Sequence, residues 1–508
     1  MLLLDDLARA SADVAATSSR TAKTVRLAEV LAGASPEEVP VAVAYLSGFL
    51  PHDAIGVGWA SIRDVPAPAG EPTLGVLDVD ATFRRVGGLS GPGSQAARRT
   101  ELHDLFARAT EPEQRLLRGL LTGEIRQGAL EGVMVEAVAK AAGVPAPAIR
   151  RAAMLRGDLG PVAAAALAEG EAGLSRFALQ VLTPLKPMLA QSADTLGEAL
   201  ERIAPASVEW KLDGARLQVH RLGDEVRAFT RSLADVTDRV PETVAAISAL
   251  DVEAIVLDGE SIALRPDQVP LAFADSMSRF GRRLEDAELR AQVPLSYFAF
   301  DCLHIDGQDV LDRPQSERFA ILKERLPEHL RVPRLVAASA DEAEPFFEDA
   351  LARGHEGVMV KALDAPYEAG RRGAGWIKVK RAKTLDLVVL AAEWGHGRRE
   401  GWLSNLHLGA RDPETGGFVM LGKTFKGMTD EVLRWQTERF LELETHREGI
   451  AVFVRPELVV EVAFDGLQTS TRYPGGLALR FARIKGYRPD KGPGDADTIE
   501  TVRALAGV

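Results

Sequence analysis

A proline-containing segment, Leu182-Thr-Pro-Leu-Lys-Pro-Met188, constrains the fold more than any other feature of the sequence. Two prolines within four residues remove backbone donors and restrict the residues before them. The segment therefore cannot continue a helix, and we expect an extended linker. A chain of 508 residues is too long for one ordinary domain. The linker predicts where the first domain ends.

Residues 1–180 predict an all-helical domain. They are rich in Ala, Leu, Glu and Arg, and glycine and proline interrupt the pattern near Pro51, Gly91–Pro92 and Gly157–Gly160. Apolar residues recur at helical spacing. Examples are Leu102, Leu105, Phe106, Leu116, Leu117, Leu120 and Leu121.

Residues 181–384 predict a mixed α+β domain. Short runs rich in β-branched and aromatic residues alternate with helical patterns, and Asp-Gly or Gly-Asp turns punctuate them. The predicted strands are 207–211, 217–220, 254–257 and 295–300. The predicted helices lie near 194–203, 241–249, 314–325 and 341–353.

Residues 385–508 predict a β-rich domain with one interposed helix near 429–443. This order of five strands and one helix suits an OB-fold. The predicted strands are 387–392, 402–408, 418–421, 458–463 and 479–484.

Six short strings follow one another through the second and third regions. Each is common by itself, since Glu209-Trp-Lys-Leu-Asp-Gly-Ala-Arg216 alone is consistent with a strand that ends in an ordinary turn. Six in sequence are not expected by chance, so their order is informative. They are Glu209–Arg216, Leu257–Glu260, Ala299–Asp301, Glu356–Lys361, Trp376–Lys380 and Arg480–Lys491.

The series resembles the covalent nucleotidyltransferase superfamily, which joins DNA ligases, RNA ligases and mRNA capping enzymes. The chain is most similar to ATP-dependent DNA ligases of the stand-alone, replicative type. The resemblance covers essentially the whole chain, including Met154–Gly160 and Pro184–Ala190. It implies an enzyme that seals nicks in duplex DNA. AMP passes from ATP to Lys211 and then to the 5′-phosphate of the nick, and the 3′-hydroxyl displaces it.

The residue types suit this chemistry. Lys211 must attack as a neutral amine, whereas a free lysine has a pKa near about 10.4. We expect the cations Arg216 and Lys378, together with a bound metal, to lower that pKa. Glu260 and Glu356 are carboxylates on separate strands. Hard oxygen ligands of this kind suit Mg²⁺ or Mn²⁺.

The resemblance assigns further residues to the nucleotide. It implies that Phe300 stacks on adenine, with plain core packing as the alternative, and that Glu209 reads the adenine edge. It implies that Arg488, Asp490 and Lys491 orient the leaving pyrophosphate. The ribose and phosphates are then contacted by Arg216, Arg231, Glu260, Lys361, Arg372, Lys378 and Lys380.

Three alternative functions stay open. RNA ligases and capping enzymes share the lysine motif, but capping enzymes lack a helical domain of this length ahead of it. An NAD-dependent DNA ligase is disfavoured because its four-cysteine zinc module needs more than the single Cys302. A non-catalytic DNA-clamping protein is disfavoured because Lys211, Glu260 and Glu356 are all present.

The expected partner is nicked duplex DNA, and the expected state is a monomer. The net charge of −12 argues mildly against nucleic acid, but binding depends on local basic surface rather than on the sum. No glutamine-led aromatic motif names a sliding clamp, and nothing selects among replication, repair and recombination. We expect a cytoplasmic, nucleoid-associated protein, because the start lacks signal-peptide features and no apolar run is long enough to cross a bilayer.

Overall fold

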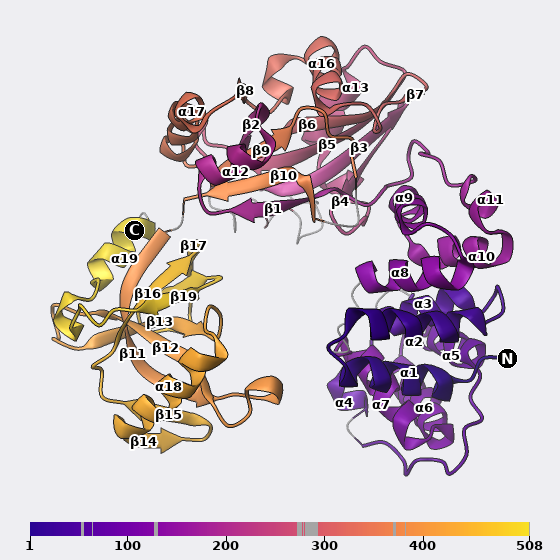
Figure 1. The fold of residues 1–508 in the computed structure, drawn as a ribbon, viewed down its shortest axis with the longest axis horizontal. Coiled ribbons are helices and arrows are strands. Elements are labelled where there is room, and N and C mark those ends of the chain that lie inside the picture. Colours follow the sequence, from indigo (N-terminus) through magenta and orange to yellow (C-terminus); the bar gives the residue numbers. More distant parts are fainter. Residues whose placement is uncertain are drawn as a thin grey trace. The chain divides into compact units, whose positions relative to one another are not determined.

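The chain folds into two compact units in a computed structural model, Met1–Val379 and Lys380–Val508, and each is described by itself. The structure describes residues 1–51, 55–62, 64–125, 131–271, 277, 279, 293–368, 372–381 and 383–506. Figure 1 shows the ribbon coloured along the sequence.

The first unit begins with helices only, as predicted. Gly123 and Gly157 end two of them in the left-handed conformation that glycine adopts without strain, with φ of 67° and 78°. Leu27, Phe83 and Phe106 belong to the apolar core that these helices share. The helices are α1 (Leu4–Ala16), α2 (Arg20–Ala32), α3 (Val39–Ser47), α4 (Trp59–Ile62), α5 (Val76–Gly88), α6 (Ser94–Arg108), α7 (Glu111–Thr122), α8 (Glu131–Ala142), α9 (Ala146–Arg156), α10 (Leu159–Glu169) and α11 (Glu171–Leu174).

The proline-containing segment 182–188 forms neither helix nor strand, and a five-stranded sheet follows it. Helices α12 (Leu196–Ile203) and α17 (Ala340–Ala352) pack on one face of this sheet through an apolar cluster. Hydroxyls of Thr195 and Ser339 cap the N-termini of these two helices. The strand order is β1 (Leu189–Ala193), β10 (Arg372–Lys380), β9 (Gly357–Ala362), β2 (Ala206–Lys211) and β8 (Arg334–Ala337).

A second five-stranded sheet completes this mixed region. Its outer face packs against α13 (Pro241–Ser248) and α16 (Gln315–Arg325). Short 3-10 turns, η1 (Thr237–Arg239) and η2 (Glu328–Leu330), lie in the connections. The strand order is β4 (Glu225–Thr230), β3 (Ala215–Leu222), β5 (Ala254–Ala263), β6 (Leu295–Ile305) and β7 (Gln308–Asp309).

The inner faces of the two sheets meet. Lys361 of β9 donates to the carbonyl of Phe300 on β6 at 3.1 Å, and the rings of Phe300 and Trp376 lie 5.7 Å apart. Arg216 and Lys361 both lie near the Phe300 ring at this junction, at 5.4 and 4.6 Å.

The second unit is β-rich with one helix between strands, as predicted, but it holds more strands than the five expected. Among its described residues it contains β11 (Lys383–Trp394), β12 (Leu403–Arg411), β13 (Phe418–Thr424), α18 (Asp430–Glu442), β14 (Glu444–Glu448), β15 (Ala451–Val454), β16 (Val459–Phe464), β17 (Gly466–Thr469), β18 (Leu477–Arg480), β19 (Arg483–Tyr487) and α19 (Ile499–Ala506), with short turns η3 (Gly397–Arg399) and η4 (Pro493–Asp495).

The predicted strand 479–484 is in fact two strands. Phe481 has φ of 54°, a left-handed conformation that interrupts β-structure, and it separates β18 from β19. The prediction of an all-helical region, a mixed α+β domain and a β-rich domain is confirmed. No helix in the part of the chain that the structure describes is long and apolar enough to cross a membrane.

Candidate active site

Lys211 is the last residue of β2, which pairs with β8 on one side and β9 on the other. Two paired neighbours hold the strand end in place. The backbone N–H of Glu356 donates to the carbonyl of Lys211 at 3.2 Å, and the Glu356 carboxylate forms an ion pair with the Lys211 ammonium. Their side chains are 19% and 16% exposed, so both groups are reachable but mostly enclosed.

The Asp-Gly turn after Lys211 needs its glycine. A Cβ atom on Gly214 would lie 2.3 Å from the carbonyl oxygen of Ser261 on β5, a distance that no real Cβ tolerates. The close approach lets the Gly214 N–H donate to the Glu260 carboxylate at 3.2 Å. The turn therefore brings Glu260 to the same end of β2 as Lys211.

The structure overturns the expectation that the pKa of Lys211 is lowered. Burial does lower this pKa, but the nearby carboxylates Glu356, Glu260 and Asp213 raise it, and the net shift is upward. From the sequence alone, cations are expected to dominate the surroundings of Lys211. In the folded chain the groups that face it most closely are acids.

For Glu260, burial acts in the opposite direction from its effect on Lys211. Burial raises the pKa of Glu260 to about 7, against the lowering effects of Lys211, Arg216 and the Gly214 N–H.

Arg216 is held by an acid that sequence reasoning did not single out. Its guanidinium donates two hydrogen bonds to Asp258, at 3.0 and 2.6 Å, and one to the carbonyl of Met188 at 2.7 Å. The hydroxyl of Tyr367 donates to the same carboxylate at 2.7 Å. Arg216 lies 5.4 Å from the Phe300 ring, so this network fixes a cation beside the aromatic wall of the site.

Glu209 and Lys361 form a buried ion pair at 2.5 Å, and each side chain is 1% exposed. Glu209 also accepts from the Ser207 hydroxyl at 3.0 Å and from Gln315 at 3.3 Å. The Lys361 ammonium lies 4.6 Å from the Phe300 ring. The Glu209–Lys361 pair is therefore buried next to Phe300, whose own side chain is half-buried.

The remaining predicted residues of the first unit lie on β10 and in the turn after β4. Lys378 is half-buried on β10 opposite Ser192. Arg231 is exposed in the turn after β4 and, among the described residues, makes no ion pair with the cluster around Lys211. Arg372 begins β10, and its side chain lies outside the described residues.

The second unit holds the last predicted group. Arg488 lies 3.1 Å from Asp386 and 2.6 Å from Asp490. Lys491 pairs with the same Asp386 carboxylate, which is 12% exposed. Sequence reasoning missed Asp386, because 102 residues separate it from Arg488. Lys380, at the start of this unit, lies 3.7 Å from Asp465.

The donor set for a metal is small. The described residues contain no group of three or more His, Cys, Asp or Glu side chains placed to hold an ion. Glu260 and Glu356 nevertheless both act on Lys211. Mg²⁺ commonly takes one or two carboxylates and fills its remaining positions with substrate phosphates and water. The two glutamates fit a cation of that kind.

Three family models match successive parts of the chain. Residues 60–139 match the DNA ligase N terminus, residues 187–380 the ATP-dependent DNA ligase domain, and residues 399–491 the ATP-dependent DNA ligase C-terminal region. A "Probable DNA ligase" of Anaeromyxobacter dehalogenans (strain 2CP-C) is 59% identical and is aligned over 100% of both chains. The chain belongs to the ATP-dependent DNA ligase family.

Other relatives agree over the full length. A "Probable DNA ligase" of Mycolicibacterium gilvum (strain PYR-GCK) is 60% identical over 99% of each chain. A solved structure named Pmar-Lig_Pre covers 95% of this enzyme and 99% of that chain, with a TM-score of 0.63 at 18% identity, which shows a shared fold.

Proposed function

We propose that the enzyme seals nicks in duplex DNA in three phosphoryl transfers, and that Lys211 is the nucleophile of the first. The observation that carries this assignment is the position of its amine, which is mostly enclosed at a strand end between two carboxylates. In the first transfer, the Lys211 amine attacks the α-phosphorus of ATP, a P–N bond forms and pyrophosphate leaves. AMP then moves to the 5′-phosphate of the nick, and the 3′-hydroxyl expels it.

We propose that the nucleotide lies between the two sheets. Phe300 would stack on adenine and Glu209 would meet the adenine edge. Arg216, fixed by Asp258, would supply a preorganised charge to the ribose or phosphates, with Lys361, Lys378, Lys380, Arg231 and Arg372 completing the set. The supporting observation is the cluster of Arg216 and Lys361 around the Phe300 ring, at 5.4 and 4.6 Å.

Glu260 and Glu356 would hold Mg²⁺ or Mn²⁺. The ion would neutralise phosphate charge during in-line displacement. The glutamates would have a second role in this arrangement, since their charge raises the pKa of Lys211 against the lowering effect of burial.

In the second unit, Arg488, Asp490 and Lys491 would orient the leaving pyrophosphate during the first transfer. Asp386 would hold both cations in place. Arg488 pairs with two acids, Asp386 and Asp490, and Lys491 shares Asp386, so the group is a constrained cluster rather than a set of freely mobile side chains.

Contact with duplex DNA is proposed for an exposed aromatic patch of the second unit, Phe425 and Phe481, whose side chains are 54% and 61% exposed. Cations accompany both rings. Arg399 lies 5.7 Å from the ring of Phe425, and Lys426 and Arg480 lie 5.8 and 5.7 Å from that of Phe481. Basic and aromatic side chains together suit a nucleic-acid backbone.

We propose domain limits of 1–180 for a helical DNA-binding domain, 181–384 for the adenylation domain and 385–508 for an OB-fold domain. Support comes from α11, which ends at Leu174, and from the matched ranges 187–380 and 399–491.

The test is transfer of radiolabelled AMP from ATP to the purified full-length chain. We expect Lys211→Ala to abolish labelling while its circular dichroism and melting temperature stay unchanged. The matched control is Lys140→Ala, an exposed lysine on α8, which should label like the wild type. Wild-type labelling of the Lys211→Ala protein contradicts the assignment.

A further inference from the structure

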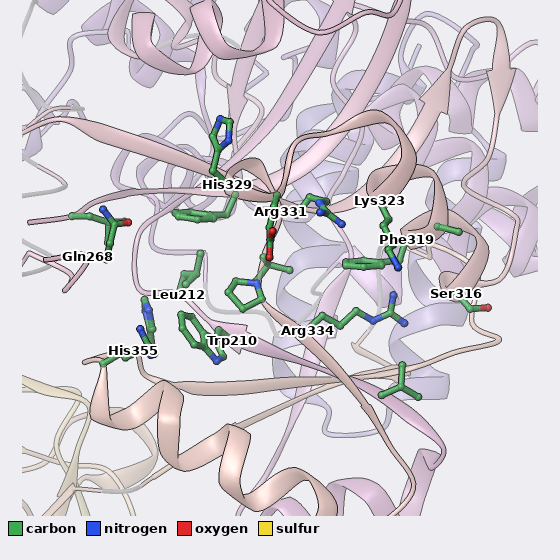
Figure 2. Close-up of a pocket in the computed structure, with 18 residues that line it drawn as sticks. Trp210, Leu212, Gln268, Ser316, Phe319, Lys323, His329, Arg331, Arg334 and His355 are labelled. Atoms are coloured by element: carbon green, nitrogen blue, oxygen red, sulfur yellow. The ribbon is translucent and has the colours of Figure 1, made fainter. Parts of the chain in front are cut away.

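A cavity of about 710 Å³ lies beside the active site but does not contain it. Trp210 and Leu212, the neighbours of Lys211 in the chain, line it, and so does His355, the neighbour of Glu356. Trp210 faces the opposite side of β2 from Lys211, because successive side chains of a strand face opposite sides. Figure 2 shows Trp210, Leu212 and His355 on one side of the cavity and Phe319, Lys323 and Arg334 on the other.

The cavity is lined by cations that form no ion pair with a described residue. Lys323, Arg331 and Arg334 line it, and none of them forms an ion pair with a described residue. Arg353 also lines it but is bonded to Asp349 at 3.0 Å. The one acid among the lining residues, Glu328, pairs with none of the three unpaired cations.

Arg331 and Arg334 also have buried nitrogen atoms without a hydrogen-bond partner in the described part of the chain. The Nε atoms of Arg331 and Arg334 are buried and have no partner among the described residues, and the same holds for Nδ1 of His355, a residue that is 7% exposed. Arg334 makes one side-chain hydrogen bond, to Gln315 at 3.2 Å, and stacks on Phe319 at 4.0 Å. Burial lowers the pKa of Arg334, with partial compensation from Glu209 and Asp301. A partly buried guanidinium in such surroundings gains from an anion.

We propose that this cavity binds a phosphate group at a site separate from the ATP cleft. Two guanidinium groups and one ammonium present forked and single N–H donors, the combination that recognises phosphate oxygens. Three cations suit a phosphate better than a single carboxylate. The phosphate belongs either to a small free ligand or to the backbone of DNA, and the experiment distinguishes these sources.

Residues of the ATP cleft do not take part. Lys211, Glu260 and Phe300 do not line this cavity, so filling the cleft leaves it open. The rings of Trp210 and His355 lie 4.8 Å apart and are tilted by 36°, and these residues directly precede Lys211 and Glu356 in the chain.

The experiment uses the full chain after adenylylation, so that covalent AMP fills the cleft. AMP on Lys211 is quantified first, so that failed labelling, which counts against the proposed function, is separate from failed phosphate binding. Three probes are titrated by calorimetry at constant ionic strength: inorganic phosphate, dTMP and an unnicked duplex.

Lys323→Ala with Arg331→Ala is the test variant, and Arg325→Ala is its control. Arg325 lies on the same helix as Lys323, is 40% exposed and does not line the cavity. We expect inorganic phosphate and dTMP to bind the wild type and the control equally. The double variant should bind them at least about tenfold more weakly, equivalent to about 1.4 kcal/mol.

The three probes distinguish the possible sources of the phosphate. If only duplex affinity falls in the double variant, the site takes backbone phosphate of DNA. If no probe distinguishes the double variant from Arg325→Ala, the proposal is wrong. The single variant Lys323→Ala, at an exposed position, repeats the comparison should the double variant melt at a lower temperature than the wild type.

Discussion

Replacing Arg318 by methionine removes one partner of an ion pair that is closed off from solvent. Arg318 of α16 is 0% exposed and Asp301 of β6 is 1% exposed. Two parallel hydrogen bonds join them, at 2.7 and 3.0 Å. Arg318 also donates to the carbonyls of Arg313 and Ala365, so it links three segments of the chain.

The expected cost follows from what is left behind. Arg318→Met keeps the length of the side chain but leaves the Asp301 carboxylate buried, with the Cys302 N–H as its remaining donor. Breaking a buried pair from one side costs about 3–5 kcal/mol. For a domain of this size, roughly 2–4 °C is lost per kcal/mol, so the melting temperature should fall by roughly 6–20 °C.

The double variant Arg318→Met with Asp301→Leu sharpens the test. Replacing both partners by apolar groups removes the unpaired charge, so it should be more stable than Arg318→Met alone. Urea unfolding followed by tryptophan fluorescence measures all three proteins, and Arg325→Met on the same helix serves as the exposed control. The reasoning is refuted if Arg318→Met lowers the free energy of unfolding by less than about 1 kcal/mol, or if the double variant is less stable than Arg318→Met.

Three further predictions concern the reaction. Self-adenylylation should rise with pH through the pKa of Lys211, because the neutral amine attacks. Glu356 raises that pKa, so the residual activity of Glu356→Gln should show a profile shifted to lower pH; an unshifted profile of adenylylation rate against pH contradicts this. Removing residues 1–180 should spare some self-adenylylation but abolish most nick sealing, and the full chain should lose DNA affinity steeply with salt, since phosphate contacts release counterions; equal sealing by the truncated chain counts against it. Arg488→Ala with Lys491→Ala should slow adenylylation by about 100-fold yet still seal a nick that already carries a 5′-adenylate, and Asp386→Asn should act in the same direction more weakly. A loss confined to sealing means that these cations hold DNA instead.

Local pattern predicted most of the fold. The predicted helix near 429–443 is α18, and the predicted strand 207–211 is β2, because both carry a clear apolar period. Strand β14 was missed since Glu444–Glu448 is mostly polar and exposed. Its backbone pairs with β15, and that pairing depends on the partner rather than on its own side chains. The left-handed Phe481 is likewise invisible in the sequence.

The candidate site, like the fold, could be predicted from the sequence only in part. The motif strings identified the residues around the cleft, but not the partners that hold them. Asp258 lies within the string that contains Glu260, yet its bond to Arg216 follows from the register of β3 against β5. Asp386 is separated from Lys491 by 105 residues. Partners so far apart in sequence become visible only when the chain is folded.

The reversed pKa of Lys211 changes how the first transfer must work. In the free enzyme, Glu356 and Glu260 favour the charged amine, which cannot attack phosphorus. The same two carboxylates are the ligands proposed for the divalent cation. A cation there withdraws their negative charge from Lys211 and adds positive charge beside it, and both changes lower the pKa of the amine. Burial raises the pKa of Glu260 to about 7, and a bound cation would favour its charged form. If the two glutamates hold the cation as proposed, cation binding and release of the lysine proton would be coupled through two shared side chains, and the Lys211 amine would become nucleophilic when the cation that stabilises the phosphates is bound.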